Sequence, residues 1–216
     1  MNTVKIDKKN CRMIAHRGVS GLEKENTCAA FVAAGVKTYY GIETDVHVTA
    51  DGEYFIFHDD NMKRIAGVDM DIERSTAEQL RTVRMPDTDG KTFRSDLVVP
   101  ALKDYISICG KYDKTAVLEL KNPMERKHVL NIAALVKDMG WLDRTIFISF
   151  AKENLVILRE EYRYADLQFL TGEASDENFE FMKRYRLGAD LCGACVSREY
   201  VSRLHAEGLP VNCWTI

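Results

Sequence analysis

Three features are missing from this sequence of 216 residues: a long apolar run, a cluster of basic residues and a leader-like start. No apolar run approaches the roughly 20 residues that a membrane-spanning helix needs, so we expect no integral membrane segment. Residues 1–12 carry charges but no apolar signal-peptide core, so we predict a cytoplasmic protein. The formal net charge is -3 and no Lys or Arg cluster stands out, which argues against a nucleic-acid partner.

Cysteines are few and show no metal-binding pattern. The six cysteines include one close pair, Cys192 and Cys195, and neither a second pair nor histidines stand at zinc-ligand spacing. We therefore expect reduced, mostly buried thiols.

The chain does have the composition of a globular domain. With 46% hydrophobic and 29% charged residues, it can bury one sizeable core, and we predict a single domain over residues 1–216. Short β-like runs alternate with helix-like runs, which is typical of a parallel sheet covered by helices. About eight strands favour a TIM-type (β/α)8 barrel over an open α/β sheet. The expected strands are 14–16, 42–48, 54–58, 116–120, 145–150, 167–170, 190–192 and 211–216.

Capping residues mark several helix starts. Asn26 or Thr27 can cap a helix after the first strand. Ser75 and Glu78 fit a capping box, and Asp176 can cap a later helix.

Two stretches break the alternation. Residues 59–100 are polar and contain Gly67, Pro86 and Gly90, so we predict a small insertion on the barrel rim after the third strand region. The last predicted strand has no helix after it. We therefore expect the native chain to continue, with the C-terminal segment of the barrel absent from the given sequence.

Glu43 and Asp45 are the first candidates for chemistry. Residues two apart on a strand point to the same face, so the two carboxylates project together, with His47 beyond them. Ile42 and Val46 favour a buried strand, and paired buried carboxylates favour a divalent metal. A solvent-facing polar stripe is the alternative.

The hairpin that follows brings a histidine into the same region. Asp51 and Gly52 form a strong turn signal between two β-like runs. Pairing the chain symmetrically about that turn places His58 opposite Asp45, a placement that a slip of one residue would undo.

Two further strand ends carry charged groups. Glu119 and Lys121 share one face at the end of a predicted strand, which is where a barrel builds its active site. An exposed ion pair is the alternative. His16 and Arg17 end the first strand, where histidine can exchange a proton and arginine can bind phosphate oxygens.

Together these residues suit phosphoryl chemistry. The carboxylates of Glu43, Asp45 and Glu119 can hold one hard cation. Arg17 and Lys121 can neutralise a phosphodiester. His16 and His58 can serve as general base and general acid.

These motifs resemble the bacterial glycerophosphodiester phosphodiesterase family along nearly the whole chain. The matching blocks are His-Arg-Gly at 16–18, Glu-Asn-Thr at 25–27, Gly-Ile-Glu-Thr-Asp-Val at 41–46, Thr-Ala-Asp-Gly at 49–52, Phe-His-Asp at 57–59, Pro-Ala-Leu at 100–102, Leu-Glu-Leu-Lys at 118–121, Ile-Ser-Phe at 148–150 and Cys-Trp-Thr at 213–215. The chain departs from the family pattern at Lys24, where proline is common.

The resemblance implies roles for these residues. Glu43, Asp45 and Glu119 would be the ligands of Mg²⁺ or Ca²⁺. His16 and His58 would be the acid/base pair, while Arg17 and Lys121 would contact phosphate. Trp214 would lie near the glycerol or leaving group. The reaction would be hydrolysis of a small-molecule glycerophosphodiester to an alcohol and sn-glycerol 3-phosphate.

Other functions stay open on the sequence alone. A metal-dependent sugar-phosphate isomerase or aldolase would use Lys121 as a proton or imine carrier. A lyase-type relative would act on lysophospholipids or sphingolipids and release a cyclic phosphate. A catalytically silent barrel would only bind a ligand.

Overall fold

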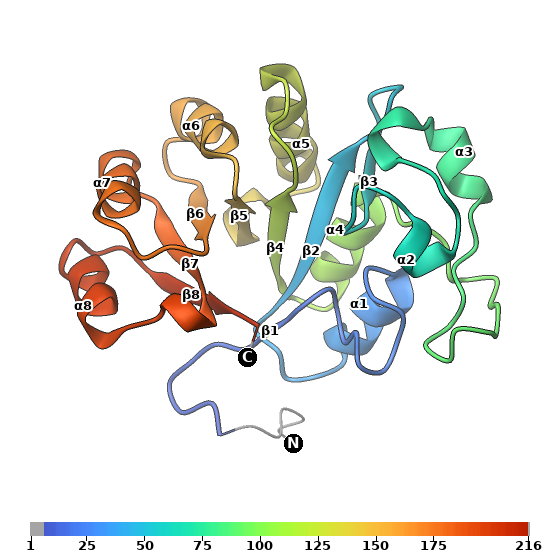
Figure 1. The fold of residues 1–216 in the computed structure, drawn as a ribbon, viewed down its shortest axis with the longest axis horizontal. Helices are drawn as coiled ribbons and strands as arrows, with labels where there is room; N and C mark the ends of the chain where they lie inside the picture. The colour runs from blue at the N-terminus through green and yellow to red at the C-terminus, as the bar shows by residue number, and fades with distance from the viewer. Residues whose placement is uncertain (1–6, 216) are drawn as a thin grey trace.

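A computed structural model describes residues 7–215, and its centre is a curved sheet of strands with helices outside it (Figure 1). Strands β1, β2, β4, β5, β6, β7 and β8 pair in parallel in that order, and β3 pairs antiparallel with β2. The strands are β1 (Ile14–Ala15), β2 (Gly41–Val48), β3 (Tyr54–Ile56), β4 (Thr115–Leu120), β5 (Thr145–Ser149), β6 (Asp166–Thr171), β7 (Gly188–Cys192) and β8 (Val211–Trp214). This is the α/β barrel architecture that the alternating pattern predicts.

Helices connect the parallel strands and cover the outer face of the sheet. They are α1 (Cys28–Gly35), α4 (Leu102–Lys111), α5 (Arg126–Asp138), α6 (Lys152–Glu161), α7 (Asp176–Tyr185) and α8 (Arg198–Ala206). Short 3-10 turns η2 (Leu142–Arg144) and η3 (Gly193–Cys195) precede β5 and follow β7. The main core lies between strands and helices, where Ile42, Leu118 and Phe147 pack with Phe31 and Ile132. No helix within the described range is long and apolar enough to cross a membrane.

A second, smaller apolar cluster fills the inside of the curved sheet. Val117, Ile148 and Leu170 form it, and Ile14 of β1 and Trp214 of β8 pack against it. Among residues 7–215, β1 and β8 are the two ends of the sheet and do not pair with each other. Because both end strands contribute to the same inner cluster, the sheet curls round towards closure.

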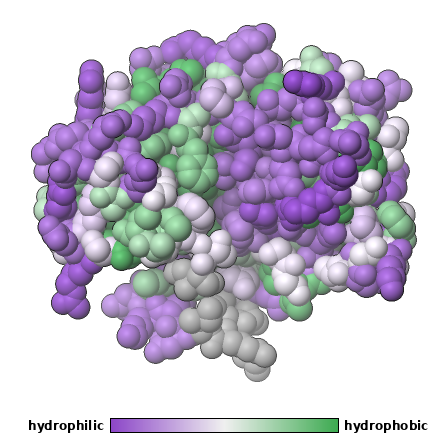
Figure 2. Space-filling view, viewed as in Figure 1, coloured by the Kyte–Doolittle hydropathy of each residue, from purple (hydrophilic) through white to green (hydrophobic). Residues whose placement is uncertain are grey.

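The segment between β3 and α4 has an apolar cluster of its own. It contains α2 (Lys63–Ala66), η1 (Ile72–Arg74) and α3 (Ala77–Thr82). Met62, Ile72 and Leu80 are buried there against Phe55 and Phe57 at the end of the hairpin. Figure 2 shows mostly hydrophilic residues on the side where Figure 1 places α2 and α3, so polar side chains cover this cluster.

Some predicted local details are wrong. The capping box before α3 uses Thr76 and Gln79 instead of Ser75 and Glu78. Ser75 is already engaged, because its hydroxyl donates to Asp71 O at 2.7 Å and its N–H donates to Ile72 O at the end of η1.

Two other helix caps were predicted only in part. Of the two predicted caps of α1, Thr27 is the one that caps the helix, and Ser175 caps α7 in place of Asp176.

The six cysteines are free, as predicted, but the expectation of mostly buried thiols is wrong. Cys109 is buried, Cys11 is exposed and the other four are partly exposed, because Cys28 begins α1 and Cys192, Cys195 and Cys213 lie in or next to the last two strands.

Candidate active site

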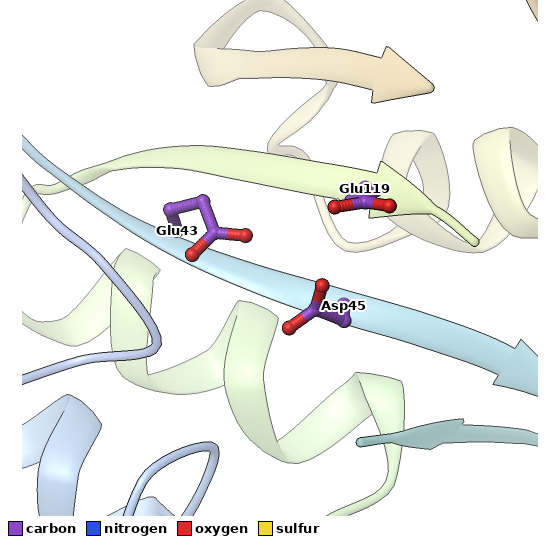
Figure 3. A group of neighbouring side chains, drawn as sticks. All are labelled: Glu43, Asp45 and Glu119. Atoms are coloured by element: carbon purple, nitrogen blue, oxygen red, sulfur yellow. The ribbon is translucent and has the colours of Figure 1, made fainter. Parts of the chain in front are cut away.

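Three buried carboxylates meet across two neighbouring strands. Glu43 and Asp45 project from β2, and the parallel register places Glu119 of β4 beside Asp45. Their exposed fractions are 8%, 1% and 6%. One oxygen of each carboxylate lies within 4.8 Å of the others, and Figure 3 shows the three groups facing one another.

Burial and mutual repulsion disfavour the charged forms of Glu43 and Glu119. Burial, followed by the charges of Asp45 and Glu119, raises the pKa of Glu43 well above its ordinary value. Burial and Asp45 raise the pKa of Glu119 to about 7. Burial lowers the pKa of Lys121, but Asp45 and Glu119 outweigh that effect and leave it raised. The Lys121 ammonium lies 2.9 Å from Glu119 Oε1 and 3.4 Å from Asp45 Oδ1.

The donor set fits a hard divalent cation. Asp45 Oδ1 and Glu119 Oε1 are buried, and neither has a partner with hydrogen-bond geometry in the described part of the chain. The Lys121 ammonium offsets only part of the charge of the three carboxylates, and negatively charged oxygen ligands are those that Mg²⁺ and Ca²⁺ prefer. Glu43, Asp45 and Glu119 are therefore the residues that could hold the predicted metal.

The turn after β1 brings His16 and Arg17 to this cluster. Arg17 has a left-handed backbone with φ of 53°, and its N–H donates to Glu43 Oε2 at 2.9 Å. Gly18 follows with φ of 75°, and a Cβ added there would lie 2.7 Å from the backbone carbon of Ala30. A side chain at this position would therefore collide with the start of α1. His16 Nε2 lies 3.9 Å from Glu43 Oε2, and burial followed by the charge of Arg17 lowers its pKa.

The predicted pairing of Asp45 with His58 is wrong by one residue. Val46 pairs with Ile56, and Phe57 N–H donates to Asp45 O at 3.0 Å, so Phe57 takes the position opposite Asp45. The turn has three residues, 50–52, between Thr49 and Glu53, one more than the two-residue turn assumed for the pairing. The Thr49 hydroxyl stabilises this turn, because it donates to Asp51 and accepts from the Glu53 N–H.

His58 nevertheless lies in the same region. It follows the end of β3, and its Nδ1 lies 2.6 Å from Asp59 Oδ1. It is close enough to His16 for its charge to contribute to the lowered pKa of that side chain.

Asn26, one of the two predicted caps of α1, is instead a residue of the site. It is buried and has a left-handed backbone with φ of 55°. Its Nδ2 donates to Asp45 Oδ2 at 2.8 Å, and its Oδ1 accepts from the Thr44 hydroxyl at 2.7 Å. Asn26 therefore orients one predicted metal ligand. The Glu-Asn-Thr block at 25–27 was the available signal, but its link to Asp45 was not visible in the sequence.

Comparison with known proteins gives the family. The sequence profile of the glycerophosphoryl diester phosphodiesterase family matches residues 16–216. The chain belongs to this family. The family resemblance of the sequence motifs is confirmed, and phosphodiesterase chemistry is supported at the level of the family.

Individual relatives agree. A glycerophosphodiester phosphodiesterase of Bacillus altitudinis is 24% identical over 213 residues, which cover 95% of this chain and 86% of the relative. A solved Oleispira antarctica phosphodiesterase, in complex with the product sn-glycerol-3-phosphate, superposes with a TM-score of 0.85 at 24% identity, over 95% and 85% of the two chains. The glycerophosphodiester phosphodiesterase of Thermotoga maritima has a TM-score of 0.75 at 26% identity, over 95% and 86%.

Trp214, predicted to lie near the substrate of a glycerophosphodiester phosphodiesterase, ends β8. Its ring lies 6.0 Å from that of Phe150, and its Nε1–H donates to Asp190 O at 3.3 Å. Trp214 thus packs at the end of the inner cluster with an exposed Phe150 beside it. Its role towards a ligand stays a prediction.

Two further buried polar groups lie on the strands of this barrel. His47 continues the Glu43 and Asp45 face of β2, is fully buried, and has Nδ1 3.0 Å from Glu73 Oε1 of η1. Asp190 of β7 is 5% exposed, and burial raises its pKa to about 7.

Proposed function

We propose that the chain hydrolyses glycerophosphodiesters to an alcohol and sn-glycerol 3-phosphate in a reaction that depends on a divalent cation. The observation that carries the proposal is the buried cluster of Glu43, Asp45 and Glu119 with His16 and Arg17 beside it. Three carboxylates this close repel one another, and a bound cation would relieve that repulsion. A bound Mg²⁺ or Ca²⁺ would offset the charge that develops on a phosphodiester oxygen.

Two basic side chains suit the remaining phosphate oxygens. Arg17 presents a guanidinium that can bind two oxygens at once. Lys121 stays protonated at neutral pH because Asp45 and Glu119 keep its pKa raised. A phosphodiester placed between these residues would be held in a fixed orientation, which lowers the entropic part of the barrier.

The two histidines fit opposite proton-transfer roles. The lowered pKa of His16 leaves its imidazole neutral at pH 7, so it can take a proton from the nucleophile. His58 Nδ1 lies 2.6 Å from Asp59 Oδ1, a contact that orients the ring, so His58 takes the second role and gives a proton to the leaving alkoxide. The nucleophile is water, or the glycerol hydroxyl of the substrate through a cyclic phosphate.

The test is hydrolysis of glycerophosphocholine with coupled detection of sn-glycerol 3-phosphate. His16→Asn and His58→Asn should each lower turnover by roughly 10²- to 10⁴-fold, the usual contribution of a general acid or base. His205→Asn, on the exposed surface of α8, is the control and should keep wild-type turnover. Near-normal turnover of either active-site variant would rule out the paired-histidine scheme, and no product from wild type would rule out the activity.

A further inference from the structure

A continuous chain of ion pairs links the turn after β1, which contains Arg17, with the turn after β3, which contains His58. His58 Nδ1 lies 2.6 Å from Asp59 Oδ1, and Arg64 donates to both Asp59 oxygens at 2.6 and 2.8 Å. The same guanidinium donates to Glu25 at 2.9 and 3.2 Å. Glu25 in turn accepts from Arg17 Nη1 at 2.9 Å. One side chain, Arg64, thus connects the partner of His58 with the partner of Arg17.

Both bridging carboxylates are held in their charged form. The hydrogen bonds from Arg64, and after them the contact with His58, keep the pKa of Asp59 well below its ordinary value. Burial raises the pKa of Glu25, but its bonds to Arg64 and Arg17 outweigh burial and leave it lowered. Two charged acceptors on one planar guanidinium fix its geometry on both sides.

The three linked residues come from two parts of the fold, because Asp59 and Arg64 are five residues apart in the chain. Glu25 lies in the turn between β1 and α1, Asp59 follows β3, and Arg64 lies in α2 of the segment between β3 and α4. That segment has its own apolar cluster, so α2 has a fixed support. Arg64 is therefore anchored apart from the turn that carries Arg17 and Glu25, in the same segment as Asp59.

We infer that Arg64 is a positioning residue that sets the orientation of Arg17 and His58 together, through Glu25 and Asp59. The inference rests on the proposed function, because it assigns a task to Arg64 only if Arg17 binds phosphate and His58 transfers a proton. A small displacement of groups that contact the reacting atoms can lower turnover by about 10²-fold.

The same segment contains a matched control. Arg94 also binds several carboxylates, with Glu23 at 2.8 Å, Asp96 at 2.7 Å and Asp87 at 3.2 Å. None of these three is a partner of a proposed site residue. If Arg64→Ala lowered activity only through the loss of ion pairs in this segment, Arg94→Ala should lower activity by the same amount.

The first experiment compares kcat and KM of wild type, Arg64→Ala and Arg94→Ala on glycerophosphocholine, with thermal unfolding of each. We expect Arg64→Ala to lower kcat/KM by about 10- to 100-fold, with kcat carrying part of the loss, and Arg94→Ala to stay within about twofold. Arg64→Lys should stay low, because one ammonium cannot reproduce the two-sided fork. Equal kinetics of Arg64→Ala and Arg94→Ala, or full rescue by lysine, would overturn the inference.

A second set of variants replaces the two carboxylates that Arg64 joins, and keeps the guanidinium. Glu25→Gln and Asp59→Asn leave Arg64 and its helix intact, so they test the chain even if Arg64→Ala unfolds. Adding Arg64→Ala to the Glu25→Gln/Asp59→Asn double variant should cause no further loss, whereas an independent role of Arg64 would cause a full additional loss. Wild-type turnover separates the two hypotheses: an inactive wild type refutes the proposed function, and an active wild type with additive variants refutes only the role of Arg64.

Discussion

Replacing Glu119 by glutamine should stabilise the metal-free protein at alkaline pH. Glu119 is buried beside Asp45, and burial together with that charge raises its pKa to about 7 from an ordinary value of 4.5. The folded protein thus holds the Glu119 proton more tightly than the unfolded chain does. Stability from this group is fully present below pH 4.5 and is lost as pH rises to about 7.

The size of the effect follows from that interval. A difference between 4.5 and about 7 corresponds to a destabilisation of about 3 kcal/mol at pH 8. Glutamine has the same shape without the charge, so Glu119→Gln removes this penalty. For a chain of this length, about 3 kcal/mol shifts the melting temperature by roughly 6 to 12 °C.

The assay is thermal unfolding of EDTA-treated protein, followed by circular dichroism at pH 5 and pH 8. Glu119→Gln should melt above wild type at pH 8 and show a smaller gain at pH 5. Glu53→Gln, an exposed residue of the hairpin turn, should show neither effect. Added Mg²⁺ or Ca²⁺ should raise the melting temperature of wild type more than that of Glu119→Gln. A Glu119→Gln protein that melts below wild type at pH 8 would refute the reasoning, because the carboxylates would then not repel one another.

Two further variants probe buried polar groups. Asn26→Ala leaves Asp45 Oδ2 and the Thr44 hydroxyl without their partner, so urea unfolding should show a loss of about 1–3 kcal/mol, and an unchanged midpoint would contradict the orienting role. Burial raises the pKa of Asp190 to about 7, so between pH 6 and pH 8.5 wild type should lose more stability than Asp190→Asn, which keeps only the loss that comes from Glu119 and the other buried carboxylates. If the urea midpoint changed by the same amount in both proteins between pH 6 and pH 8.5, that effect of Asp190 would be excluded.

The carboxylate cluster was predictable because it depends on simple periodicity. Glu43 and Asp45 share a face of β2 by the two-residue repeat, and Glu119 shares a face of β4 with Lys121 by the same rule. Parallel pairing of β2 and β4 then places Asp45 beside Glu119. Hydrophobic alternation also identified most helices and strands.

What the sequence did not reveal depends on side chains that bond across loops. The hairpin register depends on the Thr49 hydroxyl, which the turn signal at Asp51 and Gly52 does not include. Asn26 reaches Asp45 only because its backbone is left-handed. Arg64 donates to Glu25, which lies 39 residues earlier in the chain, and neither periodicity nor spacing indicates such a contact.

The central claim is tested most directly by adding metal back to EDTA-treated protein and measuring release of sn-glycerol 3-phosphate from glycerophosphocholine. We predict no release without metal, recovery with Mg²⁺ or Ca²⁺, and no recovery in a Glu43→Gln/Asp45→Asn variant that still folds. Undiminished release in EDTA, or full recovery in that variant, would contradict a cation site at Glu43, Asp45 and Glu119.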